Sequence, residues 1–340
     1  MLSARWPERT VGEPVDHAIQ ATPAPSVSGP PFAPGSISLR LYPHNDLAPS
    51  EVLSEICAQA SAALRHGFDG IMTSEHHGGF AGYLPNPLQV ATFILEENDE
   101  GWAAACPLLL PLRPTALVAE EVAWLAARHP GRVGLGVAAG ALPLDFEAMD
   151  VPLGSAVDRF KSELPRLVDM LGGRDLRELG NDPALSAGRE HPVPVLSAAA
   201  SVTAARRAAH SGAGLLLEGM SSVDRLRRIC DGYDDAKGTG TKVLIRRVWV
   251  GAPDPALVAA QREVYESYSG PAAAFGDDQT ISAESPGELA TGLHAAWRAS
   301  GADALNLRIH LPGLPPDAVR RQIDLLGAEV LPALRELIPA

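Results

Sequence analysis

Short apolar runs alternate with amphipathic stretches along most of this chain, and the alternation begins at about residue 36. The apolar runs predict strands at residues 37–41, 68–73, 101–110, 132–137, 192–197, 214–217, 242–250 and 304–309. Apolar positions at helical spacing predict helices at residues 50–65, 88–96, 115–127, 155–171, 202–210, 221–233, 285–300 and 317–337. Eight strand–helix units of even spacing favour a (β/α)8 barrel, also called a TIM barrel, over a doubly wound parallel sheet.

Two segments fall outside this repeat. Residues 1–36 carry prolines spread among Ala, Ser and Gly without apolar periodicity, which indicates a flexible tail ahead of a barrel domain at residues 37–340. The tail has no continuous apolar stretch after a basic start, so a secretory signal is not expected. Residues 251–284 separate the seventh strand from its helix, and we interpret them as an insertion that forms a lid. Three aromatic residues of this insertion either line the lid or pack on an outer helix: Tyr265, Tyr268 and Phe275.

The composition is that of a globular, acidic protein. Among 340 residues, 46% are hydrophobic, and 28 Lys and Arg against 41 Asp and Glu give a net charge of −13. This charge, with no basic run interleaved with aromatic residues, argues against nucleic acid as a partner. Three scattered cysteines, Cys57, Cys106 and Cys230, indicate neither a disulfide framework nor a metal site, and fit a reducing, cytoplasmic setting. The longest apolar run, at residues 103–112, is about half of a membrane span, so no bilayer crossing is expected.

Polar side chains gather where the predicted strands end, which is the end of a (β/α)8 barrel that carries its chemistry. The most informative group is Glu75, His76 and His77, directly after the second strand. If this segment is extended, adjacent histidines point to opposite faces, so that one reaches a pocket and the other lies in packing. Other strands are followed by further polar residues: His44, Asn45, Asp145, Ser197, Glu218, Arg308 and His310. The apolar segment 108–110 adds a wall suited to a flat aromatic cofactor or an apolar substrate.

Several short segments occur in an order that resembles the bacterial luciferase-like flavin monooxygenases. They are Glu75-His76-His77, the following loop ending in Asn86-Pro87, residues 119–122, residues 131–133 and Asp145-Phe146. The resemblance covers residues 37–151 well and the later units more loosely. It implies a (β/α)8 barrel that binds reduced FMN at its carboxyl face, or coenzyme F420 in a sister branch. That branch often has Asp-His in place of Glu75-His76, so FMN is favoured.

The resemblance also implies roles for individual residues. His76 corresponds to the catalytic histidine beside the flavin, with Glu75 orienting an imidazole or capping the loop, although both histidines can also be read as plain loop residues. Cys106-Pro107 falls where the family has a cis peptide against the flavin ring, and a trans proline at a strand end is the alternative. Contacts to the substrate are expected from four residues near the rim: His44, Tyr83, Asp145 and His310.

A further group of residues concerns the cofactor phosphate. In the family it lies at the loop after strand five and the following helix, which here supplies Ser197, Ala199, Ser201 and Thr203. Capping of that helix by Ser201 explains the same residues without a ligand. After strand four this chain has Ala139 and Gly140, and Ala139 stands where bacterial luciferase carries an arginine for the phosphate. Phosphate binding is therefore weakened, moved to another arginine, or lost.

The resemblance implies a two-component monooxygenase and a homodimer. A separate NAD(P)H:flavin reductase supplies reduced FMN, which reacts with O2 to a C4a-peroxyflavin that oxidises a small organic substrate. The apolar walls shield this intermediate from water. Two alternatives stay open, an F420-dependent oxidoreductase on the same barrel and a flavin-binding paralogue without turnover.

Overall fold

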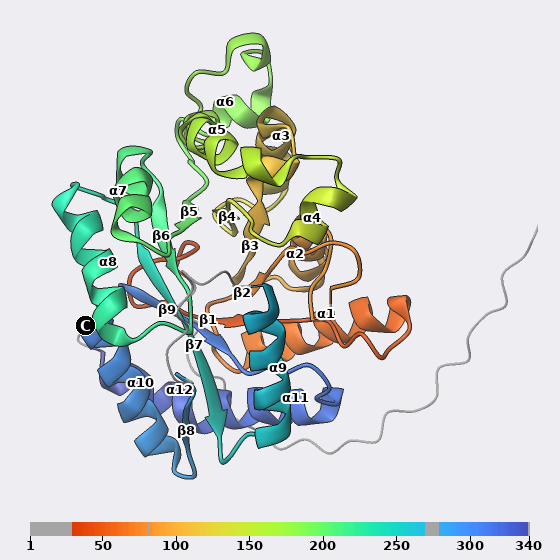
Figure 1. Ribbon diagram of the computed structural model, residues 1–340, viewed down its shortest axis with the longest axis vertical. Helices are drawn as coiled ribbons and strands as arrows, with labels where there is room; N and C mark the ends of the chain where they lie inside the picture. Colours follow the sequence, from red (N-terminus) through yellow and green to blue (C-terminus); the bar gives the residue numbers. More distant parts are fainter. Residues whose placement is uncertain (1–28, 81, 269–278, 339–340) are drawn as a thin grey trace, which may run out of the picture.

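The strands of the chain close into a parallel barrel. The computed structural model describes residues 29–80, 82–268 and 279–338, with the backbone alone from 264 to 268. The barrel strands are β1 (Ile37–Arg40), β2 (Gly70–Thr73), β3 (Trp102–Leu109), β4 (Val133–Ala138), β5 (Val195–Ala198), β6 (Gly214–Leu217), β7 (Lys242–Val250) and β9 (Ala304–Arg308). Neighbours pair in chain order, and β9 lies between β7 and β1, which closes the ring. The prediction of a (β/α)8 barrel is confirmed (Figure 1).

Helices surround the barrel because each turns an apolar stripe toward the strands. They are α1 (Pro49–Arg65), α2 (Pro87–Glu97), α3 (Thr115–Arg128), α5 (Ala156–Leu171), α7 (Val202–His210), α8 (Val223–Asp235), α10 (Pro286–Ser300) and α11 (Pro316–Leu325). In α10, for example, Leu289, Leu293 and Trp297 recur every four residues and are all buried. The last expected helix is divided, because a π-helical segment (Leu326–Val330) separates α11 from α12 (Leu331–Glu336). Within the described part of the chain, no helix combines the length and apolar character needed to cross a membrane.

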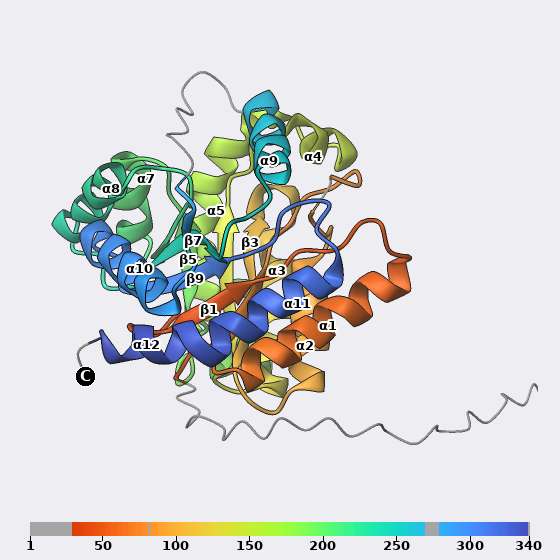
Figure 2. The same ribbon diagram turned by 90° about the horizontal axis from the view of Figure 1, so that it is seen from below.

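Short helices occupy the loops at the ends of the strands. Two of them are α4 (Pro143–Ala148), after β4, and α6 (Pro183–Ala187), before β5. Figure 2 shows α4 and α9 at one end of the barrel, and α12 with the carboxyl terminus of the chain at the other. The loop after β4 thus extends over the end where the strands finish.

The segment after β7 contains regular structure. It holds α9 (Pro255–Tyr268) and a short strand, β8 (Ile281–Ala283), which pairs in parallel with the end of β7 and lies outside the ring. This strand was not expected, since three residues carry no readable period. The side chains of Tyr265 and Tyr268, and all of Phe275, lie outside the described residues. The lid therefore stays a prediction.

A small core fills the amino-terminal end of the barrel. Phe32, although it belongs to the segment whose composition indicates a tail, is only 1% exposed, and its ring meets Trp102 edge to face at 5.0 Å between centroids. The same interior cluster contains Met72, Cys106, Leu196, Leu216, Val243 and Ala304. Gly134 of β4 leaves room for this ring, because a Cβ there would lie 2.6 Å from a Phe32 ring atom. The residues just before β1 thus close the barrel floor.

Candidate functional site

A cavity of about 480 Å3 opens at the carboxyl ends of the strands. This volume lies in the range of about 300–1,000 Å3 that is usual for cofactor and ligand sites. One side is built from small apolar residues, namely 138–141 after β4 and 198–200 at and after β5. The polar residues of the lining are Arg40, Tyr42, Ser74, Glu75, His76, Tyr83, Glu218, Arg247, Gln279 and Arg308. The cavity is thus mostly apolar, with a limited number of directed polar groups.

His76 presents one edge of its ring to this cavity while a buried carboxylate holds the other. Its Nδ1 lies 2.7 Å from Oδ2 of Asp145, which is 0% exposed. The second oxygen of Asp145 accepts a hydrogen bond of 2.7 Å from the backbone N–H of His77, so the carboxylate itself is fixed. A carboxylate at Nδ1 favours the tautomer with the proton on Nδ1 and leaves Nε2 as an acceptor. The ring of Tyr83 packs edge-on at 4.4 Å and limits its rotation.

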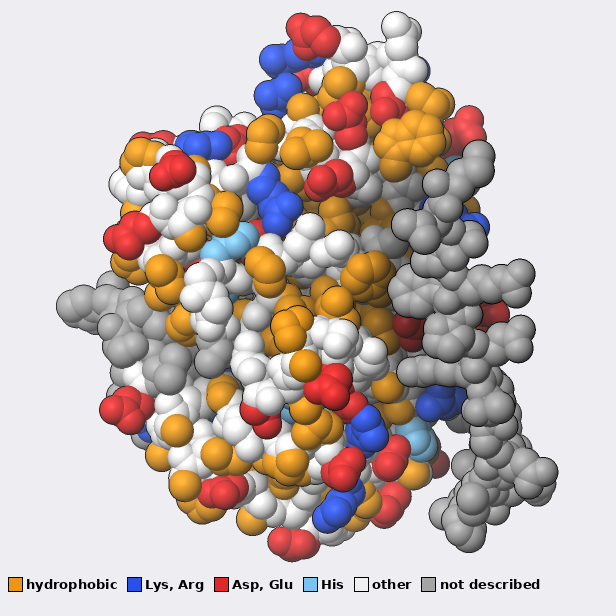
Figure 3. Space-filling model, turned by 90° about the vertical axis from the view of Figure 1, so that its right-hand side faces the viewer, with side chains coloured by type: hydrophobic (Ala, Val, Ile, Leu, Met, Phe, Trp, Pro, Cys, Tyr) orange, Lys and Arg blue, Asp and Glu red, His pale blue; other side chains and the backbone are white. Residues whose placement is uncertain are grey.

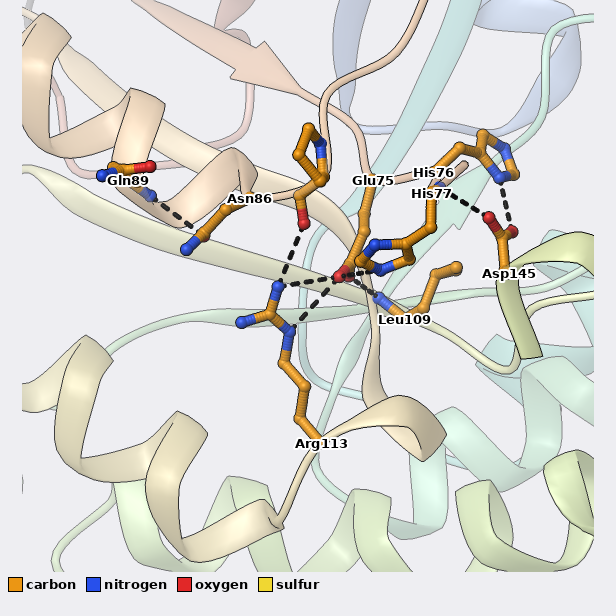
Figure 4. Close-up of polar contacts among 9 residues, drawn as sticks. Glu75, His76, His77, Asn86, Gln89, Leu109, Arg113 and Asp145 are labelled. Atoms are coloured by element: carbon orange, nitrogen blue, oxygen red, sulfur yellow. Dashed lines mark hydrogen bonds and ion pairs between the residues drawn. The ribbon is translucent and has the colours of Figure 1, made fainter. Parts of the chain in front are cut away.

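Glu75 ties the loop after β2 to the loop after β3. Its carboxylate accepts hydrogen bonds from the backbone N–H of Leu109 (2.5 Å) and from Nη2 of Arg113 (2.8 Å). It also lies 2.9 Å from Nε2 of His77, and all of these contacts are drawn in Figure 4. Both carboxylate oxygens of Glu75 are thus held by other residues of the chain, and the side chain is fully buried. Glu75 therefore positions the two loops, and the imidazole it orients is that of His77.

The expectation that one of the two histidines reaches a pocket while the other lies in packing is confirmed. His76 lines the cavity, whereas His77 is only 7% exposed and lies against Glu75. Because consecutive side chains point in opposite directions, one backbone segment serves both the cavity and the packing behind it.

The peptide bond between Cys106 and Pro107 is cis, the geometry that the family resemblance implied. Pro107 lines the cavity, while Cys106 points into the interior core. Burial raises the pKa of the Cys106 thiol to about 11, so the thiol stays protonated. Gly136 of β4 makes this packing possible, because a Cβ there would lie 2.1 Å from Sγ of Cys106.

Of the residues expected to hold a phosphate, some line the cavity and others do not. Ala139, Gly140 and Ala199 line the cavity, with Gly140 at φ +76°. Ser197 is buried within β5, and Thr203 is exposed on α7. Ser201 is the N-cap of α7, where its side chain accepts from the N–H of Ala204 at 3.2 Å.

One arginine lies near this loop that sequence reasoning did not single out. Arg225, in the first turn of α8, donates to the carbonyl oxygen of Ala200 at 3.0 Å. Its guanidinium thus lies close to the beginning of α7. The sequence offered no signal for it, because its position depends on how α7 and α8 pack together.

The four residues expected to contact substrate occupy three different environments. Tyr83 lines the cavity, and Asp145 lies behind His76. His44 and His310 are absent from the described lining of the cavity and are buried behind it. Both ring nitrogens of His44 are used by the protein, since Nδ1 donates to the carbonyl of Leu314 (3.0 Å) and Nε2 accepts from Gln59 (2.8 Å).

His310 is stacked between protein groups. Its ring stacks on Tyr42 at 5.4 Å and meets His44 edge-on at 5.0 Å. Burial, with smaller contributions from His44 and Arg308, lowers the pKa of His310 to about 3. The imidazole is therefore neutral and serves the packing behind Tyr42.

Arg40 and Arg247 line the cavity and were not anticipated. Arg247 continues the alternation of Val243 and Ile245, which lie in the interior cluster of the barrel. A charged residue at an inward-facing strand position is the signal that could have revealed it. Arg40 is only 2% exposed and donates to Oδ1 of Asn306 (2.8 Å), to the carbonyl of Cys106 (2.6 Å) and to Oγ of Ser74. Arg40 thereby joins strands β1, β3 and β9. In the described part of the chain, no group of three or more His, Cys, Asp or Glu side chains is arranged to hold a metal.

Comparisons with known proteins agree with this architecture. The family model for luciferase-like monooxygenases matches residues 35–326. The uncharacterized protein y4wF of Sinorhizobium fredii is 23% identical over 249 residues, which are 70% of this chain and 72% of that protein.

Among the solved structures that share the fold, two differ in their cofactor. The first is the oxygenating constituent of 3,6-diketocamphane monooxygenase, a type II Baeyer–Villiger monooxygenase from the CAM plasmid of Pseudomonas putida, in complex with FMN. The two chains align with a TM-score of 0.69 and 17% sequence identity, and the alignment covers 88% of this chain and 98% of the other. The second is an F420-dependent secondary alcohol dehydrogenase with an F420–acetone adduct, at TM-score 0.66 and 17% identity over 88% and 98% of the two chains. Because the family match spans most of the sequence, the chain belongs to the luciferase-like monooxygenase family.

Proposed function

We propose that this protein is the oxygenating component of a two-component flavin-dependent monooxygenase, which uses reduced FMN and O2 to oxidise a small organic substrate. The observation that carries the proposal is the pair of Asp145 and His76 at an otherwise apolar cavity. An oriented imidazole beside apolar walls is suited to proton exchange where water is excluded.

The cavity fits a flavin on two counts. Residues 138–141 and 198–200 carry almost no side-chain bulk, so a flat ring system has an apolar surface to lie on. For the phosphate, α7 offers its N-terminus, with Ser201 and Thr203, and Arg225 brings a positive charge to the same loop. Arg225 thus takes the role of the arginine that is missing at Ala139.

The residues of this chain have separate tasks in the proposed reaction. Reduced FMN, when bound, supplies the electrons that activate O2. His76 exchanges a proton at Nε2 with the substrate or the cofactor, and Asp145 keeps the ring in the tautomer that allows it. Glu75 keeps the segment of Pro107 in place against the cavity, since its N–H also donates to the carbonyl of Pro107 at 3.1 Å.

The test is titration of the protein with reduced FMN in the absence of O2, followed by rapid mixing with O2. We expect saturable binding, then a transient absorbance that precedes oxidised flavin and decays faster in the presence of substrate. His76→Ala should retain binding and alter the lifetime of the transient, whereas His191→Ala, at an exposed position, serves as the control. If His76→Ala behaves like the wild type throughout, the assignment of His76 is wrong.

The two alternatives give different outcomes in the same experiment. A protein that binds reduced F420 and not FMN, with no spectral response to O2, would be the F420-dependent oxidoreductase. A protein that binds a flavin without any effect of O2 or of His76→Ala would be the non-catalytic paralogue.

The partners of the protein form part of this proposal. A separate NAD(P)H:flavin reductase supplies the reduced FMN, and a cytoplasmic setting suits three cysteines that are all free thiols.

We further propose a homodimer, supported by an exposed apolar surface on α3, α4 and the start of α5. Among the residues whose burial is described, six of the seven exposed large hydrophobic side chains lie on these helices or on the segment between α4 and α5: Leu117, Trp124, Leu144, Met149, Leu153 and Val157. Figure 3 shows one side of the molecule, on which hydrophobic side chains are spread among polar and charged ones. Trp124→Glu should shift a dimer toward monomer in sedimentation velocity.

A further inference from the structure

We infer that the loop between β6 and α8 binds an oxyanion, a phosphate or sulfonate group, and that the carboxylate of Glu218 competes with it for the same position. The donors of this site are the backbone N–H of Met220 and the buried guanidinium of Arg246. The inference goes beyond the proposed function, because the loop would bind an oxyanion whether or not the cavity binds a flavin.

The loop lies at the cavity and leads directly into a helix. Glu218, Gly219 and Met220 all line the cavity, and α8 follows with Ser222 as its N-cap. Oε2 of Glu218 accepts a hydrogen bond of 2.6 Å from the N–H of Met220. This N–H therefore already holds an anionic oxygen, and an oxyanion that enters the loop from the cavity has to displace Glu218 from it.

A buried guanidinium lies directly behind this loop. Arg246 of β7 is only 1% exposed, and its Nη1 donates to the carbonyl oxygen of Gly219 at 3.3 Å. The backbone at Gly219 packs closely on β7, since a Cβ there would lie 3.3 Å from the carbonyl oxygen of Ile245. Because residue 219 is glycine, none of its atoms beyond the backbone stands between the guanidinium and the cavity.

The remaining donors of this guanidinium are unused. Nε and Nη2 of Arg246 are buried and have no hydrogen-bond partner among the described residues. These two nitrogens donate side by side, and the same pair in Arg128 binds both oxygens of Glu96, at 3.0 and 3.3 Å. A buried donor without an acceptor is costly, and a buried charge without a partner is more so. The pair in Arg246 is therefore suited to two oxygens of an oxyanion.

Glu218 is close to Arg246 but does not meet this need. Burial lowers the pKa of Arg246 and the carboxylate of Glu218 raises it, so the two charges act on each other. The hydrogen bond of Glu218, however, goes to the N–H of Met220, and Nε and Nη2 of Arg246 stay without an acceptor. A phosphate group presents three acceptor oxygens and can serve the N–H and both nitrogens together, which a carboxylate with two oxygens cannot.

The site adjoins the N-terminus of α7. The strands β5 and β6, which precede α7 and α8, pair with each other, and Arg225 from the first turn of α8 donates to the carbonyl oxygen of Ala200 at 3.0 Å. Two sources can thus supply the oxyanion, namely the phosphate of a cofactor lying along this side of the cavity or an anionic group of the substrate.

The test is calorimetric titration with inorganic phosphate in a phosphate-free buffer, using flavin-free protein. We expect Glu218→Gln to bind phosphate at least about tenfold more tightly than the wild type, because the competing charge is removed. Adding Arg246→Met to Glu218→Gln should weaken binding at least about tenfold, because the paired donors are lost. Glu329→Gln and Arg321→Met, at exposed positions, make the same changes of charge and should leave the affinity of the wild type unchanged.

The stability of Arg246→Met gives a second measurement. Without phosphate, its free energy of unfolding in urea should equal or exceed that of the wild type, because a buried charge without a partner is replaced by an apolar side chain of similar length. A clearly lower value would show that the guanidinium is paired in the folded protein, and would overturn the inference. An affinity for phosphate that does not respond to Glu218→Gln or to Arg246→Met, or no binding even to Glu218→Gln, would overturn it as well.

Competition between ligands identifies the source of the oxyanion. Displacement of phosphate by FMN and not by riboflavin would assign the site to the phosphate of the cofactor, whereas phosphate that stays bound beside FMN would assign it to a group of the substrate. A protein that binds phosphate with the expected response to both variants but binds no FMN would retain this inference and refute the proposed function.

Discussion

Replacing His310 by Phe should make the protein less sensitive to acid. In the folded protein the imidazole is 3% exposed, stacked on Tyr42, and its pKa is lowered to about 3 from the ordinary value of 6.5, mainly by burial. Below pH 6.5 the unfolded chain binds a proton at this position, and the folded chain does not. The contribution of the neutral His310 to the free energy of unfolding is thus fully present above pH 6.5 and is lost as the pH falls toward 3.

The size of the effect follows from the width of this window. Each pH unit between the two pKa values costs the folded state about 1.4 kcal/mol, so that lowering the pH from 6.5 to 5 costs about 2 kcal/mol. Phe keeps the aromatic stacking on Tyr42 and removes the titrating group. Titrating groups that do not contact position 310 contribute equally to both proteins and cancel in the difference.

The measurement is the free energy of unfolding in urea at a series of pH values, for wild type and His310→Phe. We expect the difference between the two to change by about 2 kcal/mol from neutral pH to about pH 5, in favour of the variant. His310→Gln, which does not titrate and is smaller, should give the same slope even if its stability is lower overall. Parallel curves for wild type and both variants would refute the reasoning.

Three further predictions follow from the packing around the site. Glu75→Gln removes the charge that pairs with Arg113, and should lower the free energy of unfolding by about 2–4 kcal/mol, whereas Glu96→Gln, at an exposed pair, should change it far less. Gly136→Ala should cost about 1–3 kcal/mol in the same assay, because the added Cβ meets Sγ of Cys106, and adding Cys106→Ala should recover part of the loss. None of the three buried cysteines should react with a thiol reagent in the native protein, because burial raises their pKa values to about 11 or 12, and all three should react after unfolding. Rapid labelling of the native chain would contradict this.

The strands and helices of the barrel were predictable because each is long enough to show its own period. β8 and α4 were not, since they are short and are stabilised by contacts with distant parts of the chain. The π-helical segment at Leu326–Val330 also escaped the pattern, because the apolar positions continue across it. Periodicity thus identifies elements that bury a face, and misses elements that depend on their neighbours.

The candidate site shows the same division. His76 was identified from its motif, but its partnership with Asp145 joins residues 69 positions apart and depends on how two loops meet. That Arg40, Arg308 and Arg247 lie side by side depends on the register between strands, which no single strand reveals. His44 and His310 follow predicted strands, yet the structure places them behind the cavity, since strand ends alone do not say which way a following residue turns.

The contacts of Asp145 with residues 76 and 77 make the loop after β2 and the loop after β4 depend on each other. α4 supplies the carboxylate, the loop after β2 supplies the ring and the N–H, and neither arrangement is complete without the other. A chimera whose new loop after β2 lacks a histidine at position 76 would leave one oxygen of the buried carboxylate without its partner, and a chimera without an aspartate at position 145 would leave the imidazole without its orientation. Loop exchange on this barrel will therefore succeed only when residues 75–77 and α4 are moved together.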